Sequence, residues 1–235
     1  MLAGATAFSI AALTVAALSM VFSYAPNEAV QGAVQRIFYF HVPCAWVAFL
    51  SFGLSAIASA FYLLLGEQVW DDIAFAAVET GMLFCTLVLV TGSLWARPIW
   101  GTWWTWDSRL TTTFILWLTY AGYLILRIAD QQSVQVARLA AVIAILAVAD
   151  IPLIVISVRL WRTIHPAVLV ERSGGRGLED PRMIRTLIVA TVAVAAIYGA
   201  LFWLRLKTLR AAARLSVLRQ SLTALQAEKG LIVPR

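Results

Sequence analysis

The stretch AFAAVETGMLFCTLVLVTGSLW, residues 74–95, contains a single charged side chain, that of Glu79. At the α-helical rise of about 1.5 Å per residue, a segment of about 20 apolar residues crosses roughly 30 Å of hydrocarbon, so this stretch is long enough to span a membrane. Five further segments have a similar length and character. The predicted spans are therefore 3–24, 43–65, 74–95, 110–128, 137–158 and 186–206.

The composition of the whole chain agrees with this prediction. Of the 235 residues, 62% are hydrophobic and only 13% are charged, whereas a soluble domain carries about 25% charged residues. A soluble core of this size cannot hide so much apolar surface, so lipid is the expected solvent. We predict an all-α integral membrane protein, a six-transmembrane helix bundle. Because no basic residue precedes Arg36, residues 2–24 are interpreted as a retained span and not as a cleaved signal.

Counting the spans places the connections on two faces of the membrane. Connections 25–42, 96–109 and 159–185 share one face, and the other two connections share the opposite face with both termini. The two histidines of the chain, His41 and His165, therefore fall on one face together with a tryptophan cluster. The 18 Lys and Arg residues divide equally between the two faces, so the positive-inside rule does not orient the bundle.

Four tryptophans crowd into the segment WGTWWTWD, at positions Trp100, Trp103, Trp104 and Trp106. If the segment is helical, the first three share one face. An interfacial aromatic belt accounts for isolated tryptophans such as Trp70, Trp95 and Trp203. A dense platform of rings instead favours a large, flat, apolar ligand.

Charged residues close this cluster. Asp107 suits either of two roles, the N-terminal cap of the next span or a contact to polar edges of the ligand. Guanidinium groups can grip both oxygens of a ligand carboxylate. The candidates for that role are Arg97, Arg109, Arg159 and Arg162.

The two histidines are candidate metal ligands. His41 is expected just ahead of the second span, where the positive end of the helix dipole disfavours protonation and keeps the imidazole in its ligand form. Heme iron accepts axial histidine, and its macrocycle needs apolar walls. His41 and His165 beside a tryptophan platform therefore indicate a heme site. Cys44 and Cys85 lie in apolar stretches and are expected to form neither a disulfide nor a zinc site.

Several structural expectations accompany this interpretation. Pro43 suits the first turn of the second span, and Pro98 is expected to end the third. Glu79 and Asp150 lie within spans and are interpreted as hydrogen-bonding residues of the packed bundle. Residues 207–229 are expected to form an amphipathic helix that lies on the membrane surface or docks a partner.

The segment WGTWWTWDSR, residues 100–109, resembles the tryptophan-rich WWD motif of the heme-handling protein superfamily. The segments FHVP at 40–43 and LWRTIH at 160–165 resemble the CcmC branch, heme exporter protein C of cytochrome c maturation. The resemblance implies a six-span heme-handling membrane domain over 1–206 and a basic cytoplasmic tail over 207–235, which is expected to be helical. Cys44, Pro166 and the long basic tail depart from the family pattern.

The resemblance also implies a site and partners. Heme b, as the transported ligand, would have His41 and His165 as axial ligands and its porphyrin edge against Trp103, Trp104, Trp106 and Asp107. The protein would sit in the inner (cytoplasmic) membrane with both termini in the cytoplasm and the tryptophan-rich loop in the periplasm. Heme would pass to the periplasmic heme chaperone CcmE, with the ABC transporter CcmAB and the small membrane protein CcmD completing the assembly.

Two alternative functions stay open from the sequence. One is a heme-conducting transporter subunit, which needs a polar pathway through the spans, where Glu79 and Asp150 are the acidic residues. The other is an electron-transfer membrane cytochrome, which usually carries its histidines inside the spans. The protein is expected not to be an enzyme, apart from a lyase-like assisting role in heme attachment to the chaperone.

Overall fold

The computed structural model describes residues 2–130, 133–161, 178 and 180–228, and in these residues it contains helices and no strands. A π-helical turn, η1, follows the first helix, and a 3-10 helix, η2, precedes the second. The bounds are α1 Leu2–Ser19, η1 Met20–Tyr24, η2 Ala33–Ile37, α2 Phe38–Leu65, α3 Gln68–Trp100, α4 Ser108–Ala129, α5 Val134–Ala147, α6 Asp150–Leu160 and α7 Pro181–Glu228.

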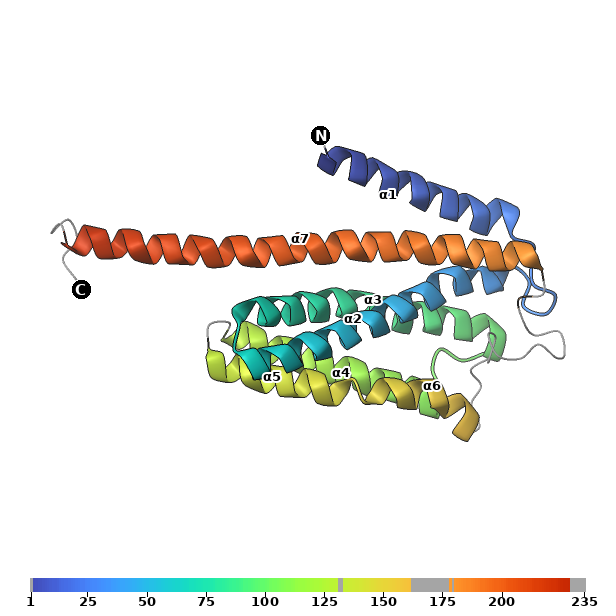
Figure 1. Cartoon of the computed structure of the whole chain (residues 1–235). Coiled ribbons are helices and arrows are strands. Elements are labelled where there is room, and N and C mark those ends of the chain that lie inside the picture. The colour runs from blue at the N-terminus through green and yellow to red at the C-terminus, as the bar shows by residue number, and fades with distance from the viewer. Residues whose placement is uncertain (1, 131–132, 162–177, 179, 229–235) are drawn as a thin grey trace.

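Within the described residues, six helical stretches are long and apolar enough to cross a membrane, at 4–24, 33–65, 68–100, 108–129, 134–157 and 181–226. Each contains one predicted span or all but a terminal residue of it, so the six-span prediction is confirmed. Helix α3 packs extensively against α2, while α5 and α7 also contact α2. Helix α4 packs against α5 and α6, and α1 contacts α7 (Figure 1).

Small residues allow the central helices to approach closely. A Cβ atom added to Gly81 of α3 would lie 2.9 Å from the Phe52 ring and 3.0 Å from Ser51 of α2. The Phe52 ring in turn stacks on Tyr120 of α4, with ring centroids 3.9 Å apart. Helix α5 buries a stripe of alanines, which is the kind of interface that brings membrane helices together. The main core therefore lies between α2, α3, α4 and α5, and it also includes Ile154 of α6 and Tyr198 of α7.

Both expected proline boundaries were wrong. Helix α2 begins at Phe38, because η2 leads directly into it, and Pro43 therefore lies inside the helix. Helix α3 continues through Pro98 to Trp100 and ends at Gly101, whose backbone φ of 74° is left-handed. The Gly101 N–H donates to the carbonyl of Arg97 at 3.0 Å, which closes the last turn after the proline.

The fifth span is not a single helix. It breaks at Val148 and Ala149, between α5 and α6. Pro152 has no N–H to donate to the Val148 carbonyl, and that carbonyl instead accepts from Ile151 at 3.1 Å. Asp150 therefore lies in the first turn of a new helix.

Two ion pairs tie other helices to α3. Arg127 of α4 donates to Asp71 at 2.6 Å, and Arg205 of α7 donates to both carboxylate oxygens of Glu79 at 2.5 and 2.8 Å. Phe75 lies between the two acids in the sequence, and both guanidinium groups lie over its ring, at 5.1 and 5.7 Å. Glu79 thus bonds within the packed bundle.

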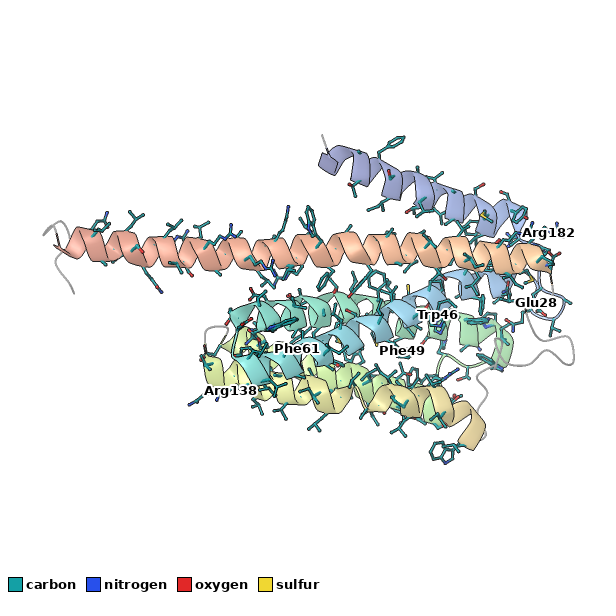
Figure 2. The ribbon with its side chains drawn as sticks, viewed as in Figure 1. Glu28, Trp46, Phe49, Phe61, Arg138 and Arg182 are labelled. Atoms are coloured by element: carbon teal, nitrogen blue, oxygen red, sulfur yellow. The ribbon has the colours of Figure 1, made fainter. Side chains whose placement is uncertain are left out.

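The described connections gather at the two ends of the bundle. Residues 25–37 and 101–107, the end of α6 and the start of α7 lie at one end, which we call the tryptophan end (Figure 1). Glu28 and Arg182 mark this end and Arg138 marks the opposite one (Figure 2). Helix α7 continues unbroken beyond that opposite end, so the segment from Lys207 to Glu228 belongs to the same helix as the last span.

Candidate functional site

His41 lies in the first turn of α2 at the tryptophan end, and not ahead of the helix as the sequence suggested. Its side chain is 8% exposed and faces the last turns of α3. The Nδ1 atom is 2.9 Å from Oγ1 of Thr91. A Cβ added to Gly92 would lie 3.2 Å from Cε1 of His41, so the missing side chain at this position makes room for the ring.

The hydrogen bonds of Thr91 assign the tautomer of His41. The Thr91 hydroxyl has one hydrogen, which it donates to the Leu87 carbonyl at 2.6 Å. The same oxygen can then only accept from the imidazole, so Nδ1 of His41 carries the proton. In the neutral ring the lone pair consequently resides on Nε2, which is the arrangement of a histidine prepared to bind a metal.

Trp95 also packs against His41. The two rings meet edge to face with centroids 5.8 Å apart, and Trp95 packs in the same way on Phe38. Trp95 is 4% exposed and donates from Nε1 to Oε1 of Gln31 at 2.8 Å. The belt interpretation was therefore wrong for Trp95, which is a buried packing residue, whereas Trp203 is 53% exposed on α7.

The tryptophan loop, Gly101–Asp107, connects α3 to α4 and is not helical. The shared face that Trp100, Trp103 and Trp104 would have had in a helix therefore does not form, because only Trp100 belongs to α3. Trp103 and Trp106 are 56% and 74% exposed. Thr102 orders the loop between them, since its hydroxyl donates to the Trp104 carbonyl at 2.9 Å.

An aromatic cluster supports the loop from beneath. Trp104 meets Trp106 and Phe114 edge to face, with centroids 5.8 and 5.9 Å away. Phe114 stacks on Trp117, whose Nε1 donates to Thr86 of α3 at 2.9 Å. The Nε1 atom of Trp104 is buried and has no hydrogen-bond acceptor within the described part of the chain. The loop thus presents exposed rings over a packed aromatic base.

Charged residues hold both ends of the loop. Asp107 caps α4, with Oδ1 accepting from the Leu110 N–H at 2.9 Å, which shows the capping role that the sequence allowed. Arg97 donates to the Gly101 carbonyl and lies 6.0 Å from the Trp103 ring centroid. Arg109 donates from Nε to the Ile154 carbonyl of α6 at 3.2 Å and so joins α4 to α6.

Other predicted site residues lie outside this description. His165 and Arg162 fall outside the described residues, and the side chain of Arg159 is not described. The structure brings His41 and the tryptophan loop to the same end of the bundle through α3. From Thr91, which bonds His41, to Gly101 the helix rises about 15 Å.

The arrangement fits one kind of ligand better than others. The described residues hold no group of three or more His, Cys, Asp or Glu side chains that could surround a metal ion, and Cys44 and Cys85 are buried free thiols. A ligand that brings most of its own metal coordination needs only an axial imidazole from the protein. His41, exposed indole rings and nearby guanidinium groups provide such a setting.

Three residues of this site were not identified from the sequence. Two of them, Thr91 and Gly92, contact His41 directly, and Gln31 acts on it through Trp95. Residues of these types are common in apolar helices and loops, so residue type alone does not mark them. Thr91 and Gly92 are neighbours on α3, about fifty residues from His41 along the chain. One sequence signal could have indicated Thr91 and Gly92. It is a hydroxyl residue next to a glycine, near the end of one span, at a height in the membrane where another span carries a histidine.

The fold is that of a helical membrane protein. A buried histidine and an exposed tryptophan-rich loop lie at the same end of its bundle. The chain belongs to the heme exporter protein C family, whose profile matches residues 2–221. It is 38% identical over 203 residues to "Heme exporter protein C" of Bradyrhizobium diazoefficiens, covering 86% of this chain and 74% of that protein. It is 37% identical over 145 residues to the protein of the same name from Escherichia coli K12, covering 61% and 59%. A cytochrome c biosynthesis ccmC-like mitochondrial protein of Arabidopsis thaliana is 36% identical over 162 residues, covering 69% and 61%.

Proposed function

We propose that this protein binds heme at the tryptophan end of the bundle and delivers it for the maturation of c-type cytochromes. Membership of the heme exporter protein C family supports the cargo and the process. The observation that carries the proposal for this chain is the hydrogen bond from His41 to Thr91, which leaves the lone pair of the imidazole on Nε2. His41 is accordingly one axial ligand of the heme iron, and His165 is the second.

The tryptophan loop holds the plane of the macrocycle. Trp103 and Trp106 expose most of their rings although the loop itself is ordered by Thr102 and by the Asp107 cap. A surface of exposed indoles on a fixed backbone can bury an apolar ring without first paying to order the loop. Trp100 and Trp104 extend the platform toward α3 and toward the aromatic base.

Arginines at the edge of the platform meet the carboxylates of the cargo. Arg97 lies beside Trp103, and Arg109 is partly buried beside the Asp107 cap. A guanidinium group binds a carboxylate through two parallel hydrogen bonds, which fixes the rotation of a flat ligand as well as its position. The cargo is heme b, the form that is not covalently attached to protein. Covalent attachment follows only after the heme leaves this site.

The tryptophan end faces the periplasm and the chain resides in the inner membrane with both termini in the cytoplasm. Heme is handed from this end to the periplasmic chaperone CcmE, and CcmD and the ABC transporter CcmAB complete the assembly. Delivery requires one axial ligand to be exchanged for a group on the chaperone. The chain assists attachment by presenting the heme, while the covalent chemistry belongs to the chaperone.

No observation on the described residues favours a heme-conducting transporter subunit or an electron-transfer cytochrome. A heme-conducting pathway needs accessible polar groups through the spans, but Glu79 is held by Arg205 and both lie on the α3–α7 contact. An electron-transfer cytochrome that holds heme within the bilayer needs ligands deep in the spans, but His41 is in the first turn of α2. The location of His41 therefore supports a surface site.

Purified protein tests the proposal through its absorption spectrum and heme content. His41→Ala should lose most of the heme and the spectrum of a histidine-ligated iron, and His165→Ala should alter the same bands. Added imidazole should partly restore the His41→Ala spectrum, because the vacated site lies against Gly92 and Trp95. Unchanged heme content and spectra in both histidine variants would remove the axial-ligand assignment.

The platform has its own test and a matched control. Replacing Trp103, Trp104 and Trp106 together by alanine should abolish heme retention, whereas Trp203→Ala should leave it unchanged. Trp203 is also an exposed indole, but it lies on α7 beneath Lys207, away from the tryptophan loop. Equal heme yields from the two variants would show that the tryptophan loop does not hold the cargo.

A further inference from the structure

The last part of α7 carries a stripe of leucines that no described residue covers. Leu215, Leu218, Leu222 and Leu225 are each 51% to 62% exposed. Figure 1 shows this part of α7 beyond the end of the bundle, where neither α1 nor any of the helices α2–α6 lies beside it. At about 1.5 Å per residue, α7 is roughly 70 Å long, more than twice the roughly 30 Å of the hydrocarbon core. Lipid therefore does not account for the exposure of these leucines.

The spacing of the stripe is that of a coiled-coil seam. The four leucines are separated alternately by three and four residues, which places them at successive a and d positions of two heptads. In that register Arg214 occupies a g position and Arg219 an e position, so both flank the seam. A helix that pairs with the leucines must therefore also meet these two cations.

The charges of the segment distinguish its possible partners. Residues 207–227 contain Lys207, Arg210, Arg214 and Arg219 and no acidic residue. Two copies in one membrane would extend their tails in the same direction and pair in parallel, so Arg214 of each copy would face Arg219 of the other. Like charges at these positions oppose association. A helix with acidic residues at the same positions would convert both repulsions into ion pairs.

The shape of the segment argues against adsorption to the membrane. A helix that turns to lie on the surface needs a break where it leaves the bilayer, and breaks require proline, glycine or an inserted group. Residues 207–228 contain neither proline nor glycine. Helix α7 accordingly runs straight past the end of the bundle (Figure 1).

We propose that residues 214–226 dock an acidic amphipathic helix of a partner protein. Leu215, Leu218, Leu222 and Leu225 form the seam of a short two-helix coiled coil, and Arg214 and Arg219 pair with acidic side chains that flank the partner's seam. The docking surface lies at the opposite end of the bundle from the tryptophan loop. The inference is independent of the heme site.

Binding of designed peptides to the full chain tests this surface. The protein is reconstituted in nanodiscs of phosphatidylcholine, and two fluorescent peptides are compared that share leucine at a and d and carry either glutamate or lysine at e and g. The acidic peptide should bind at least about tenfold more tightly. Leu218→Asn with Leu222→Asn should remove that binding, and Arg214→Glu with Arg219→Glu should reverse the preference toward the basic peptide.

Three results would overturn the proposal. Equal affinities for the two peptides would show that the cations do not select a partner. Efficient disulfide cross-linking of Leu218→Cys between copies of the full chain would show that the seam is a self-association interface. A probe at Leu225→Cys that enters an apolar environment only when phosphatidylglycerol replaces phosphatidylcholine would show that the helix binds lipid. Retention of a monodisperse, helical protein serves as the folding control for every variant.

Discussion

Arg127 of α4 and Asp71 of α3 form an ion pair at 2.6 Å in which both side chains are 5% exposed or less. The pair lies one turn from Phe75, whose ring also meets Arg205, the partner of Glu79. Asp71, Phe75 and Glu79 follow one another at intervals of four residues and share one face of α3. This face thus receives a cation from α4 and another from α7. This face holds two other spans against the helix that positions His41 and leads into the tryptophan loop.

Removing one partner of the buried pair should destabilise the fold strongly. Asp71→Ala leaves Arg127 buried without its counterion, and such a change typically costs about 3–5 kcal/mol. The variant should therefore unfold at a clearly lower temperature in detergent, as measured by the loss of far-ultraviolet circular dichroism. Replacing both partners by leucine should recover part of the lost stability, because no unpaired charge is then left inside.

An exposed ion pair provides the matched control for Asp71→Ala. Arg182 donates to Asp180 at 2.8 Å near the start of α7, where both groups are substantially solvated. The hydrogen bonds from Arg182 lower the pKa of the Asp180 carboxyl, yet water screens the attraction. Arg182→Ala removes this ion pair but keeps the hydrogen bond from the Arg182 backbone N–H to Asp180, and it should leave the unfolding midpoint unchanged within error. An equal loss for the two variants would mean that the Asp71 pair is not specially buried.

Thr91 should tune the heme site without touching the cargo. Thr91→Val removes the acceptor of the His41 Nδ1–H and should lower heme affinity about 10- to 100-fold, as loss of a ligand-orienting partner usually does. Thr91→Ser keeps the hydroxyl and should retain the wild-type value. The midpoint potential of bound heme gives a second readout, because a histidine with a weaker Nδ1–H bond donates less electron density to iron.

A purely structural role of Thr91 would give a different pattern. Valine has nearly the same shape as threonine, so packing alone predicts equal heme affinity and equal potential in Thr91→Val and the wild type. Serine lacks the methyl group and would then be the more disruptive change. The order of the two variants therefore decides between orientation of His41 and simple packing.

A side chain at Gly92 should displace the His41 ring and weaken heme binding. The Cβ of Gly92→Ala would approach Cε1 of His41 to 3.2 Å, so the ring must shift by a few tenths of an ångström and its Nε2 moves with it. We expect lower heme occupancy and altered absorption bands. Gly122→Ala in α4 is the control, since nothing lies within 4 Å of its added Cβ. Equal heme occupancy in both variants would contradict the close contact between Gly92 and His41.

The sequence predicted the helices better than their ends. Apolar length alone located all six spans, because a membrane-spanning segment must satisfy its own backbone hydrogen bonds. The prolines misled because Pro43 and Pro98 each remove only one hydrogen bond near a helix end, where neighbouring turns compensate. Pro152 breaks its span because Ile151 can bond the freed Val148 carbonyl and close a tighter turn.

The candidate ligand residues could be chosen from the sequence, but the residues that pack around them could not. Histidine and clustered tryptophan are rare in an apolar chain, so residue type alone is enough to identify them as candidates. Thr91 and Gly92 matter only because α2 and α3 pack in one register, which no local pattern specifies. Trp95 was misplaced for the same reason, since burial against His41 depends on the neighbouring helix and not on its own position in a span.

Trp104 offers a test in which stability and binding should change in opposite directions. Its Nε1 is buried without an acceptor among the described residues, and an unsatisfied buried donor typically costs about 1–3 kcal/mol. Trp104→Phe removes that donor while it keeps a ring against Phe114 and Trp106. The heme-free variant should therefore unfold at a temperature no lower than the wild type.

If a heme carboxylate bound at the proposed site is the acceptor for the Trp104 N–H, heme binding by the same variant should weaken. We expect a several-fold lower affinity in a heme titration, against little change for Trp106→Phe, whose indole is 74% exposed and already solvated. A lower stability of the heme-free Trp104→Phe protein together with unchanged heme affinity would contradict this role. In that case the Trp104 indole packs the aromatic base, and its N–H does not contact the cargo.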